Sequence, residues 1–226
     1  GIGESTLEHE LQDLIQKQTN PTIAPLATDD GIIIRRTAKA DSSEALERLL
    51  AKTKADILDR VGDYFVAEGE KTIEQVIVER LNHKKVSIAA AESLTGGKFI
   101  ERLVTVPGAS AVVQGGIVCY SPDVKMNLLE IPKQLIEEKG TVSEECAILL
   151  ARNVRDKLNS AIGISFTGVA GPGEMEGKQV GTVHIGLSIK GEEDRVYSFQ
   201  LQGNRNVIRN RALLKGLELI LNAIKL

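Results

Sequence analysis

Apolar residues in the first part of the chain follow helical spacing twice, and strand-like runs lie between the two predicted helices. Leu7, Leu11 and Leu14 mark one face of the first helix, which Asn20-Pro21 ends. In chain order, the other predicted elements are strands at 22–26 and 31–38 joined by a turn that includes Asp29-Asp30-Gly31, a helix opened by 41–44, and a short strand at 64–67. This order predicts a small α+β module over residues 1–70.

From residue 71 to the end, strand-like and helix-like runs alternate. The predicted strands are at 86–91, 112–120, 161–167, 180–189 and 195–201, and the predicted helices are at 73–81, 95–104, 122–129, 132–138, 143–158 and 204–226. The last two strands flank a turn at Lys190-Gly191 and are expected to pair antiparallel. Strands that alternate with helices are typical of α/β domains. We therefore expect residues 71–226 to form a three-layer α/β/α domain with a mixed, partly parallel sheet.

Charge is divided unequally between these two parts. The whole chain of 226 residues carries a formal net charge of −3. Residues 1–70 hold fourteen acidic and eight basic side chains, a balance of −6, whereas residues 71–226 hold seventeen acidic and twenty basic ones, a balance of +3. The C-terminal part is therefore the better host for an anionic small ligand. The acidic total argues against a nucleic-acid partner, and 3% aromatic residues leave few stacking platforms for bases.

Other features of the chain bear on where the protein works. No apolar run approaches the roughly 20 residues that a membrane-spanning helix needs. Cys119 and Cys146 fit neither a metal site nor a disulfide framework, which favours a reducing compartment, the cytoplasm. No histidine has a ligand partner at metal spacing, so we expect no metal and no cofactor. The chain opens on Gly1 rather than Met, and we expect it to be part of a longer protein.

The most informative stretch is the turn Glu92-Ser93-Leu94-Thr95-Gly96-Gly97, between a buried strand and a helix. Ser93 there could act as a nucleophile, with the amides at the helix start as a cradle for an oxyanion or a phosphate. In the alternative interpretation, Ser93 or Thr95 caps the helix and the glycines allow close packing. The stretch alone leaves both interpretations open.

Two more strand ends carry candidate chemistry, because ligands of open α/β sheets bind beyond the carboxyl ends of the strands. Tyr120 ends one predicted strand and Lys125 lies one turn into the next helix, where a partly desolvated lysine could take the proton of a serine. The alternative is a surface lysine beside a half-buried tyrosine. Thr167-Gly-Val-Ala-Gly-Pro-Gly173 ends another strand, and its glycines would let a ligand touch the backbone. Its spacing fits neither a P-loop nor a dinucleotide fingerprint.

Two arginines follow at the start of the last predicted helix. Arg205 and Arg209 are four residues apart, so they share a helix face and could bind a phosphate together. A solvated helix face explains the same spacing equally well. The three histidines, His9, His83 and His184, offer no Ser-His-Asp triad.

In combination, these turns resemble the CinA family, which is named for competence and damage inducibility. The matching motifs follow family order through most of residues 71–226: Ala91-Glu-Ser-Leu-Thr-Gly-Gly97, Val106-Pro-Gly-Ala-Ser110, Gly116-Ile-Val-Cys-Tyr-Ser121 with Lys125, Gly140-Thr-Val-Ser-Glu144, Thr167-Gly-Val-Ala-Gly-Pro172, Val180-Gly-Thr-Val183, and Gly203-Asn-Arg205 with Arg209. Residues 1–70 resemble the family's KH-like module, although no Gly-x-x-Gly loop is present. The family's N-terminal domain, similar to molybdopterin-binding proteins, is expected before Gly1.

The resemblance implies an enzyme that hydrolyses the carboxamide of nicotinamide mononucleotide to nicotinate mononucleotide and ammonia. It makes Ser93 the nucleophile, Lys125 the general base and Tyr120 a partner in proton handling. It also implies a homodimer. The residues expected to contact the nucleotide are Thr95, Gly96, Gly97, Ser110, Thr167, Gly168, Ala170, Gly171, Arg205 and Arg209. The alternative is a catalytically silent module that binds nucleotide for regulation or serves assembly, because some members of the family lack amidase activity.

Overall fold

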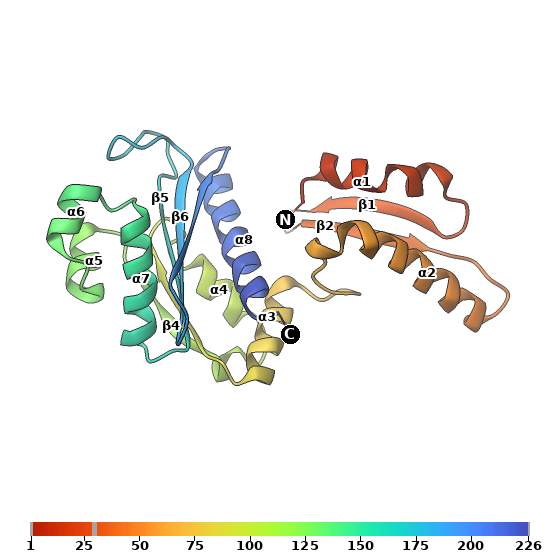
Figure 1. The fold of residues 1–226 in the computed structure, drawn as a ribbon, viewed down its shortest axis with the longest axis horizontal. Coiled ribbons are helices and arrows are strands. Elements are labelled where there is room, and N and C mark those ends of the chain that lie inside the picture. The colour runs from red at the N-terminus through yellow and green to blue at the C-terminus, as the bar shows by residue number, and fades with distance from the viewer. Residues whose placement is uncertain (1, 29–30, 226) are drawn as a thin grey trace. The chain divides into compact units, whose positions relative to one another are not determined.

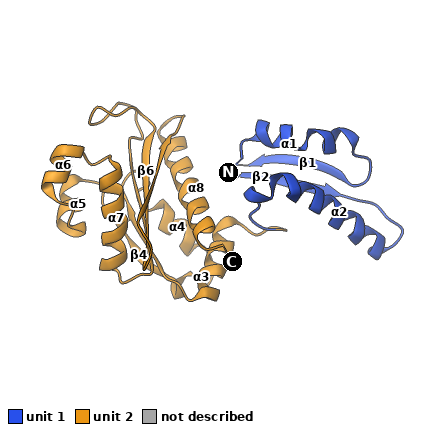
Figure 2. Ribbon diagram, viewed as in Figure 1, with its two compact units in different colours: residues 1–67 blue, residues 68–226 orange. Residues whose placement is uncertain are grey.

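The protein consists of two compact units (Figure 2). The computed structural model describes residues 2–28 and 31–225. The first unit is Gly1–Ala67 and the second is Glu68–Leu226. Among the described residues, no helix combines the length and the apolar character that crossing a membrane requires.

The first unit places two helices and a hairpin around a small apolar core. Its elements are α1 (Glu4–Lys17), β1 (Thr22–Thr28), β2 (Gly31–Thr37), α2 (Ser43–Val61) and the 3₁₀ turn η1 (Gly62–Tyr64). β1 and β2 pair antiparallel, with Leu26 opposite Ile33. The buried core consists of Leu7, Leu11, Ile23, Ile57 and Val61. The predicted α+β module is therefore present.

One predicted strand of this unit is wrong, and one predicted turn lies outside the described residues. Residues 64–67 form no strand, because the chain continues from α2 into η1, and Tyr64 and Phe65 stay 52% and 42% exposed. A segment rich in aromatic and β-branched side chains forms a strand only where a partner strand pairs with it. The sheet described in this unit pairs β1 with β2 alone. The turn at Asp29-Asp30-Gly31 includes residues 29–30, which the structure does not describe.

The second unit is built on a five-stranded mixed sheet in the order β4-β3-β5-β6-β7. The parallel strands are β3 (Ile88–Glu92), β4 (Val113–Val118) and β5 (Ile162–Gly168). β6 (Thr182–Ile189) runs antiparallel to β5, and β7 (Arg195–Gln200) runs antiparallel to β6. The predicted class, an α/β domain with a mixed sheet, is confirmed.

Helices cover both faces of this sheet (Figure 1). One face carries α5 (Pro122–Leu129), α6 (Lys133–Lys139) and α7 (Glu144–Lys157); the other carries α3 (Ile73–Lys84), α4 (Lys98–Val104) and α8 (Arg205–Ala223), and the 3₁₀ turn η2 (Ala109–Ala111) precedes β4. α7 approaches the sheet so closely that a Cβ added at Gly186 would lie 2.2 Å from the carbonyl oxygen of Ala147. On the opposite face, the rings of Phe99 and Phe166 pack 5.2 Å apart. Packing on both faces fixes the central strands and therefore the positions of their ends.

The carboxyl ends of the three parallel strands meet at one edge of the sheet. Glu92, the last residue of β3, pairs with Val118 of β4 on one side and with Phe166 of β5 on the other. The next residues along each strand, Ser93, Cys119 and Thr167, consequently lie at the same edge. This edge brings together the turns that the sequence singles out.

Candidate active site

Ser93 and Lys125 form a hydrogen-bonded pair at the carboxyl edge of the sheet. The Nζ of Lys125 lies 3.1 Å from the Oγ of Ser93. The same nitrogen donates to the carbonyl oxygens of Cys119, at 2.7 Å, and Tyr120, at 3.3 Å. The two carbonyls aim the amine at the serine hydroxyl, so that a neutral amine could take the hydroxyl proton.

The start of α5 explains why Lys125 points into this edge. Pro122 occupies the first helical position, where its missing N–H costs nothing. Ser121 is the N-cap, and its hydroxyl accepts a hydrogen bond of 3.2 Å from the amide of Val124. The predicted helix at 122–129 is confirmed, and Lys125 lies one turn from its fixed N-terminus.

Burial favours the neutral form of Lys125. The residue is 1% exposed, and its removal from water lowers the pKa of the amine. Burial also raises the pKa of the thiols of Cys119 and Cys146, the latter to about 12, so both thiols stay uncharged at neutral pH. The carboxylate of Glu176 acts in the opposite direction, because its negative charge raises the pKa of the amine. The alternative of a surface lysine is wrong.

The carboxylate of Glu92 holds the turn that follows β3. Its oxygens accept hydrogen bonds from the amides of Gly97, at 2.9 Å, and of Phe99 and Ile100, at 3.0 Å each. Glu92 is 1% exposed, and a negative charge is favourable at a helix N-terminus. The carboxylate therefore occupies the amides at the start of α4, and these amides are not available to an oxyanion or a phosphate.

The helix begins later than its hydrophobic pattern predicts. α4 starts at Lys98 rather than at 95, and its N-cap is Gly97, which makes no side-chain capping bond. Gly96 and Gly97 have φ values of +63° and +96°, a conformation that glycine adopts without strain and that forms a turn before the helix. Neither Ser93 nor Thr95 caps α4, so the capping interpretation of these two residues is wrong.

Arg209 holds the same turn from α8. Its Nε donates to the carbonyl of Leu94 at 2.7 Å, and its Nη2 donates to the carbonyl of Thr95 at 3.0 Å. A Cβ added at Gly96 would lie 3.2 Å from that Nη2, which is a tight contact. Two nitrogens of the guanidinium are therefore bound to the Ser93 turn, and a solvated helix face does not describe Arg209.

Arg205, one turn earlier in α8, connects two other segments of the site. Its Nη1 donates to the carbonyl of Gly171 at 2.6 Å, and its Nη2 donates to the hydroxyl of Tyr120 at 3.1 Å. The side chain of Tyr120 is 64% exposed, so the expectation of a half-buried tyrosine is wrong. Tyr120 thus contacts Lys125 through its main-chain carbonyl, whereas its hydroxyl is bonded to Arg205.

The glycine-rich loop after β5 lies at the same edge, but the hydroxyl at its start is already used. The Oγ1 of Thr167 donates to the carbonyl of Thr141 at 2.7 Å, and Thr167 is 1% exposed. A Cβ added at Gly168 would lie 2.6 Å from the carbonyl oxygen of Thr182, so this backbone packs against β6. Ala170 is 6% exposed. What this loop can offer a ligand is main chain, beginning near Gly171.

Ser110 does not reach this edge of the sheet. It lies in η2, which precedes β4, whereas the site lies beyond the last residue of β4, Val118. A strand rises about 3.3 Å per residue, which separates the two ends of β4 by about 16 Å. The expectation that Ser110 contacts a nucleotide bound at Ser93 is therefore not met within one copy of the chain.

Sequence reasoning missed a carboxylate in the loop between β5 and β6. Glu176 lies between Met175 and Lys178, whose backbones form a bridge, and its carboxylate accepts hydrogen bonds from the hydroxyl of Thr141 at 2.7 Å and from the amide of Val142 at 3.1 Å. Burial alone would raise the pKa of Glu176, but the hydrogen bonds outweigh it and lower the pKa. No local pattern signals this contact, because its partners precede α7.

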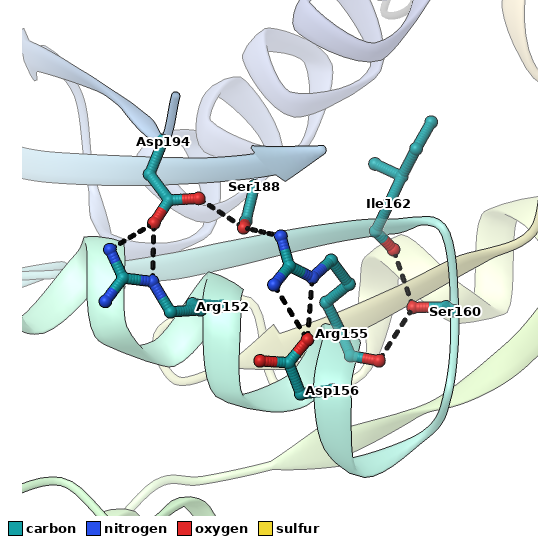
Figure 3. A network of polar contacts seen from close by, with 7 residues as sticks. All are labelled: Arg152, Arg155, Asp156, Ser160, Ile162, Ser188 and Asp194. Carbon is teal, nitrogen blue, oxygen red and sulfur yellow. Dashed lines mark hydrogen bonds and ion pairs between the residues drawn. The ribbon is translucent and has the colours of Figure 1, made fainter. Parts of the chain in front are cut away.

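A second polar cluster (Figure 3) lies at the opposite edge of the sheet, where Ser188 pairs with Gly163 near the amino end of β5. Arg152 of α7 donates to Asp194 at 2.6 Å, Arg155 donates to Ser188 at 2.8 Å, and Ser188 donates in turn to Asp194. Beside it lies a shallow depression of about 530 Å³. These side chains are hydrogen-bonded to one another, and their contacts connect α7 to the turn between β6 and β7. Neither here nor elsewhere in the described part of the chain do three or more His, Cys, Asp or Glu side chains form a group that could hold a metal ion.

Comparison with known proteins gives a consistent family relationship for both units. Residues 70–224 match the family described as CinA C-terminal domain, and residues 1–67 match the damage-inducible protein CinA KH domain. Curated relatives from Oceanobacillus iheyensis and a Geobacillus species are each 50% identical, over 100% and 99% of this chain, and are provisionally named competence-damage inducible protein. The chain spans 54% of the length of each of these relatives.

Solved structures share the fold over about two thirds of the chain. The competence/damage inducible protein CihA from Agrobacterium tumefaciens is 26% identical with a TM-score of 0.62, and the match covers 70% of this chain and 99% of that protein. A competence or damage-inducible protein from Enterobacter asburiae is 25% identical with a TM-score of 0.65, over 69% of this chain and 100% of that protein.

Proposed function

This chain belongs to the CinA family, and from that premise we propose that its second unit is an amidase that hydrolyses the carboxamide of nicotinamide mononucleotide. The products are nicotinate mononucleotide and ammonia. The observation that carries the proposal is the 3.1 Å contact between the Oγ of Ser93 and the Nζ of a lysine that is 1% exposed. A serine nucleophile with a lysine of lowered pKa can hydrolyse an amide without a histidine.

In the proposed first half-reaction, Lys125 begins as the neutral amine. The Oγ of Ser93 attacks the carboxamide carbon while the Nζ of Lys125 accepts the hydroxyl proton. The resulting tetrahedral intermediate carries a negative charge on the former carboxamide oxygen. Lys125 then gives its proton to the nitrogen of the substrate, the C–N bond breaks, and ammonia leaves an ester on Ser93.

In the second half-reaction, water attacks this ester. The neutral Lys125 accepts a proton from the water and returns it to the Oγ of Ser93 as the ester bond breaks. Nicotinate mononucleotide leaves, and Ser93 and Lys125 are restored. The carbonyls of Cys119 and Tyr120, which hold the amine at 2.7 Å and 3.3 Å, keep it within reach of the serine in both halves.

Arg205 is the residue that we propose for the phosphate of the nucleotide. It is exposed and lies between the main chain of Gly171 and the hydroxyl of Tyr120. A guanidinium is well suited to a phosphate because its planar nitrogens can donate to two oxygens. The main chain near Gly171 and the hydroxyl of Tyr120 would then lie beside the ribose and the phosphate.

The location and the assembly of the protein belong to the same proposal. We propose a homodimer because the resemblance to the CinA family implies one. The proposed location is the cytoplasm, because two buried thiols, Cys119 and Cys146, form no disulfide. The first unit would serve as a spacer or a subunit contact. Light scattering on the purified chain measures the assembly, and a monomer at micromolar concentration would contradict it.

Ammonia release from nicotinamide mononucleotide tests the activity. The wild-type chain is expected to release ammonia, and Ser93→Ala and Lys125→Met are expected to lower kcat by about 10³-fold or more. Lys133→Met, at a lysine whose side chain is 77% exposed in α6, is the matched control and should leave the rate unchanged. Equal rates in wild type and Ser93→Ala would overturn the proposal.

A silent nucleotide-binding module makes a different prediction for the same protein. It would bind nicotinamide mononucleotide saturably in a calorimeter and release no ammonia. Arg205→Ala would weaken that binding. Binding without release of ammonia would replace the amidase by this function, and the absence of both would leave assembly as the role of the unit.

A further inference from the structure

Two side chains, those of Glu92 and Arg209, bind the main chain of the turn that carries the nucleophile. The inference rests on the proposed amidase function: we propose that Arg209 is a positioning residue that orients two peptide groups of this turn, and that the N–H groups of Thr95 and Gly96 receive the oxyanion. The amides at the start of α4 cannot do so, because the carboxylate of Glu92 occupies those of Gly97, Phe99 and Ile100.

The contacts of Arg209 determine which way the two peptide groups face. Its guanidinium binds the carbonyls of Leu94, at 2.7 Å, and of Thr95, at 3.0 Å. In a trans peptide the carbonyl and the following N–H point in opposite directions. The N–H of Thr95 and the N–H of Gly96 therefore point away from Arg209. Two consecutive donors are thus presented together, two and three residues after Ser93.

These two donors have no partner among the residues that the structure describes. The amide of Ser93, by contrast, donates to the carbonyl of Phe166 at 2.9 Å and stays part of the sheet. Thr95 is 0% exposed, and its Oγ1 is also buried without a hydrogen-bond partner. Buried polar groups are normally paired, and a buried group without a partner needs an explanation such as a catalytic role. The turn therefore has one buried donor without a partner, the N–H of Thr95, and a second N–H, that of Gly96, in an exposed residue that a ligand can reach.

The geometry at Gly96 agrees with these hydrogen bonds. Gly96 has a φ of +63°, and a Cβ there would lie 3.2 Å from the Nη2 of Arg209. A side chain at this position would both strain the backbone and press on the guanidinium. A glycine at this position therefore permits both the close contact with Arg209 and the orientation of the Gly96 amide.

Positioning by Arg209 and binding of a phosphate by Arg209 predict different kinetics. Loss of an oxyanion donor weakens the transition state more than the bound substrate, so kcat falls while KM changes little. Loss of a phosphate ligand weakens the bound substrate, so KM rises. The two arginines of α8 can thus be separated, with Arg209 affecting kcat and Arg205 affecting KM.

The experiment compares four variants with nicotinamide mononucleotide as substrate. Arg209→Ala is expected to lower kcat by about 10²-fold with KM within twofold of wild type. Arg209→Lys can donate to one of the two carbonyls, so its kcat should lie between those of wild type and Arg209→Ala. Arg205→Ala is expected to raise KM. Arg211→Ala is the control, because Arg211 is an exposed residue of α8 that also binds a carbonyl, that of Gln202. A raised KM with unchanged kcat in Arg209→Ala, or no change at all, would overturn the inference.

A second measurement keeps this inference distinct from the activity itself. Amide hydrogen exchange of the peptide that covers 93–100 should be faster in Arg209→Ala than in wild type and unchanged in Arg211→Ala. If the wild type releases no ammonia, the proposed function fails, and exchange alone decides whether Arg209 clamps the turn. Unchanged exchange in Arg209→Ala would show that the turn holds its shape without Arg209.

Discussion

At the scale of single residues, the state of the site depends on one proton. A charged Lys125 can only donate to Ser93, whereas the neutral amine can accept the hydroxyl proton. Burial of Lys125 lowers its pKa, and the carboxylate of Glu176 opposes that effect. The balance between burial and the surrounding groups that raise the pKa of this amine, of which Glu176 is one, sets the pH at which the neutral amine becomes available.

The pH dependence of the proposed reaction follows from this balance. Activity should rise as pH rises through the pKa of Lys125, because only the neutral form accepts a proton. Glu176→Gln removes a negative charge that raises this pKa, so the acid limb of kcat/KM should move to lower pH. Ammonia release measured across pH checks this, with Glu174→Gln as the control at an exposed residue of the same loop. An acid limb that stays in place or moves to higher pH would count against the role of Glu176.

The two thiols beside the site should be unreactive while the protein is folded. Cys119 and Cys146 are 0% exposed, and burial raises the pKa of both, so neither provides an accessible thiolate at pH 8. Labelling with a disulfide reagent should give no reaction in buffer and two equivalents in urea. A thiol that reacts within minutes in buffer would show that the α7 face of the sheet opens.

What could be predicted at this scale depended on local signals. Ser93 and Lys125 each follow a strand end, and strand ends can be read from the pattern of apolar residues. Glu92 also carried a signal, because a carboxylate directly before a glycine pair and a helix can bind the first amides of that helix. Glu176 carried none: its partners, Thr141 and Val142, meet it only in the folded chain.

At the scale of elements, α4 shows how a short helix is fixed by a residue outside it. The helix spans Lys98–Val104, and three amides at its start are bound by Glu92 at the end of β3. Short helices are not stable on their own, so such tertiary contacts decide where they begin. The predicted start at 95 was too early because the pattern of apolar residues cannot show that Gly96 and Gly97 form a turn.

Removal of the Glu92 carboxylate should destabilise the protein. Glu92→Ala leaves three amides without their partner and is expected to lower the free energy of unfolding by about 3 kcal/mol. Glu92→Gln keeps one acceptor oxygen and should cost less. Urea unfolding followed by circular dichroism measures both, and Glu101→Ala, at an exposed residue of the same helix, is the control. If Glu92→Ala and Glu101→Ala had the same effect, Glu92 would not be the cap.

At the scale of the whole molecule, the second unit has two polar regions, and they lie at opposite ends of the strands of its sheet. Ser93 and Lys125 lie at the carboxyl edge of the parallel strands, whereas the cluster of Arg152 and Asp194 lies at the other edge (Figure 3). Mixed α/β sheets place ligands at the first of these edges. The order of the strands could not be predicted from the sequence, because it depends on pairings between strands that are distant in the chain. That the turns after the strands share one edge could be predicted.

Ser110 tests how complete the site is within one copy of the chain. Because η2 lies at the amino end of β4, Ser110→Ala should leave kcat and KM for nicotinamide mononucleotide within twofold of wild type. Arg205→Ala, which removes a contact at the site, should not. The same ammonia assay measures both. A raised KM in Ser110→Ala would mean that a second copy brings its own Ser110 to the site.

The position of β3 in the sheet also has a consequence for the order of folding. Ile88 of β3 pairs with Ile162, so this strand closes the longest loop between paired strands of the sheet, whereas β5, β6, β7 and α7 are near one another in sequence. Contacts of high sequence separation form late, because the chain must lose more entropy to close them. In refolding from urea, ammonia release should therefore return after the far-ultraviolet circular dichroism has recovered. A partly folded chain would then hold Ser93 apart from its base, and the activated serine would exist only in the finished protein.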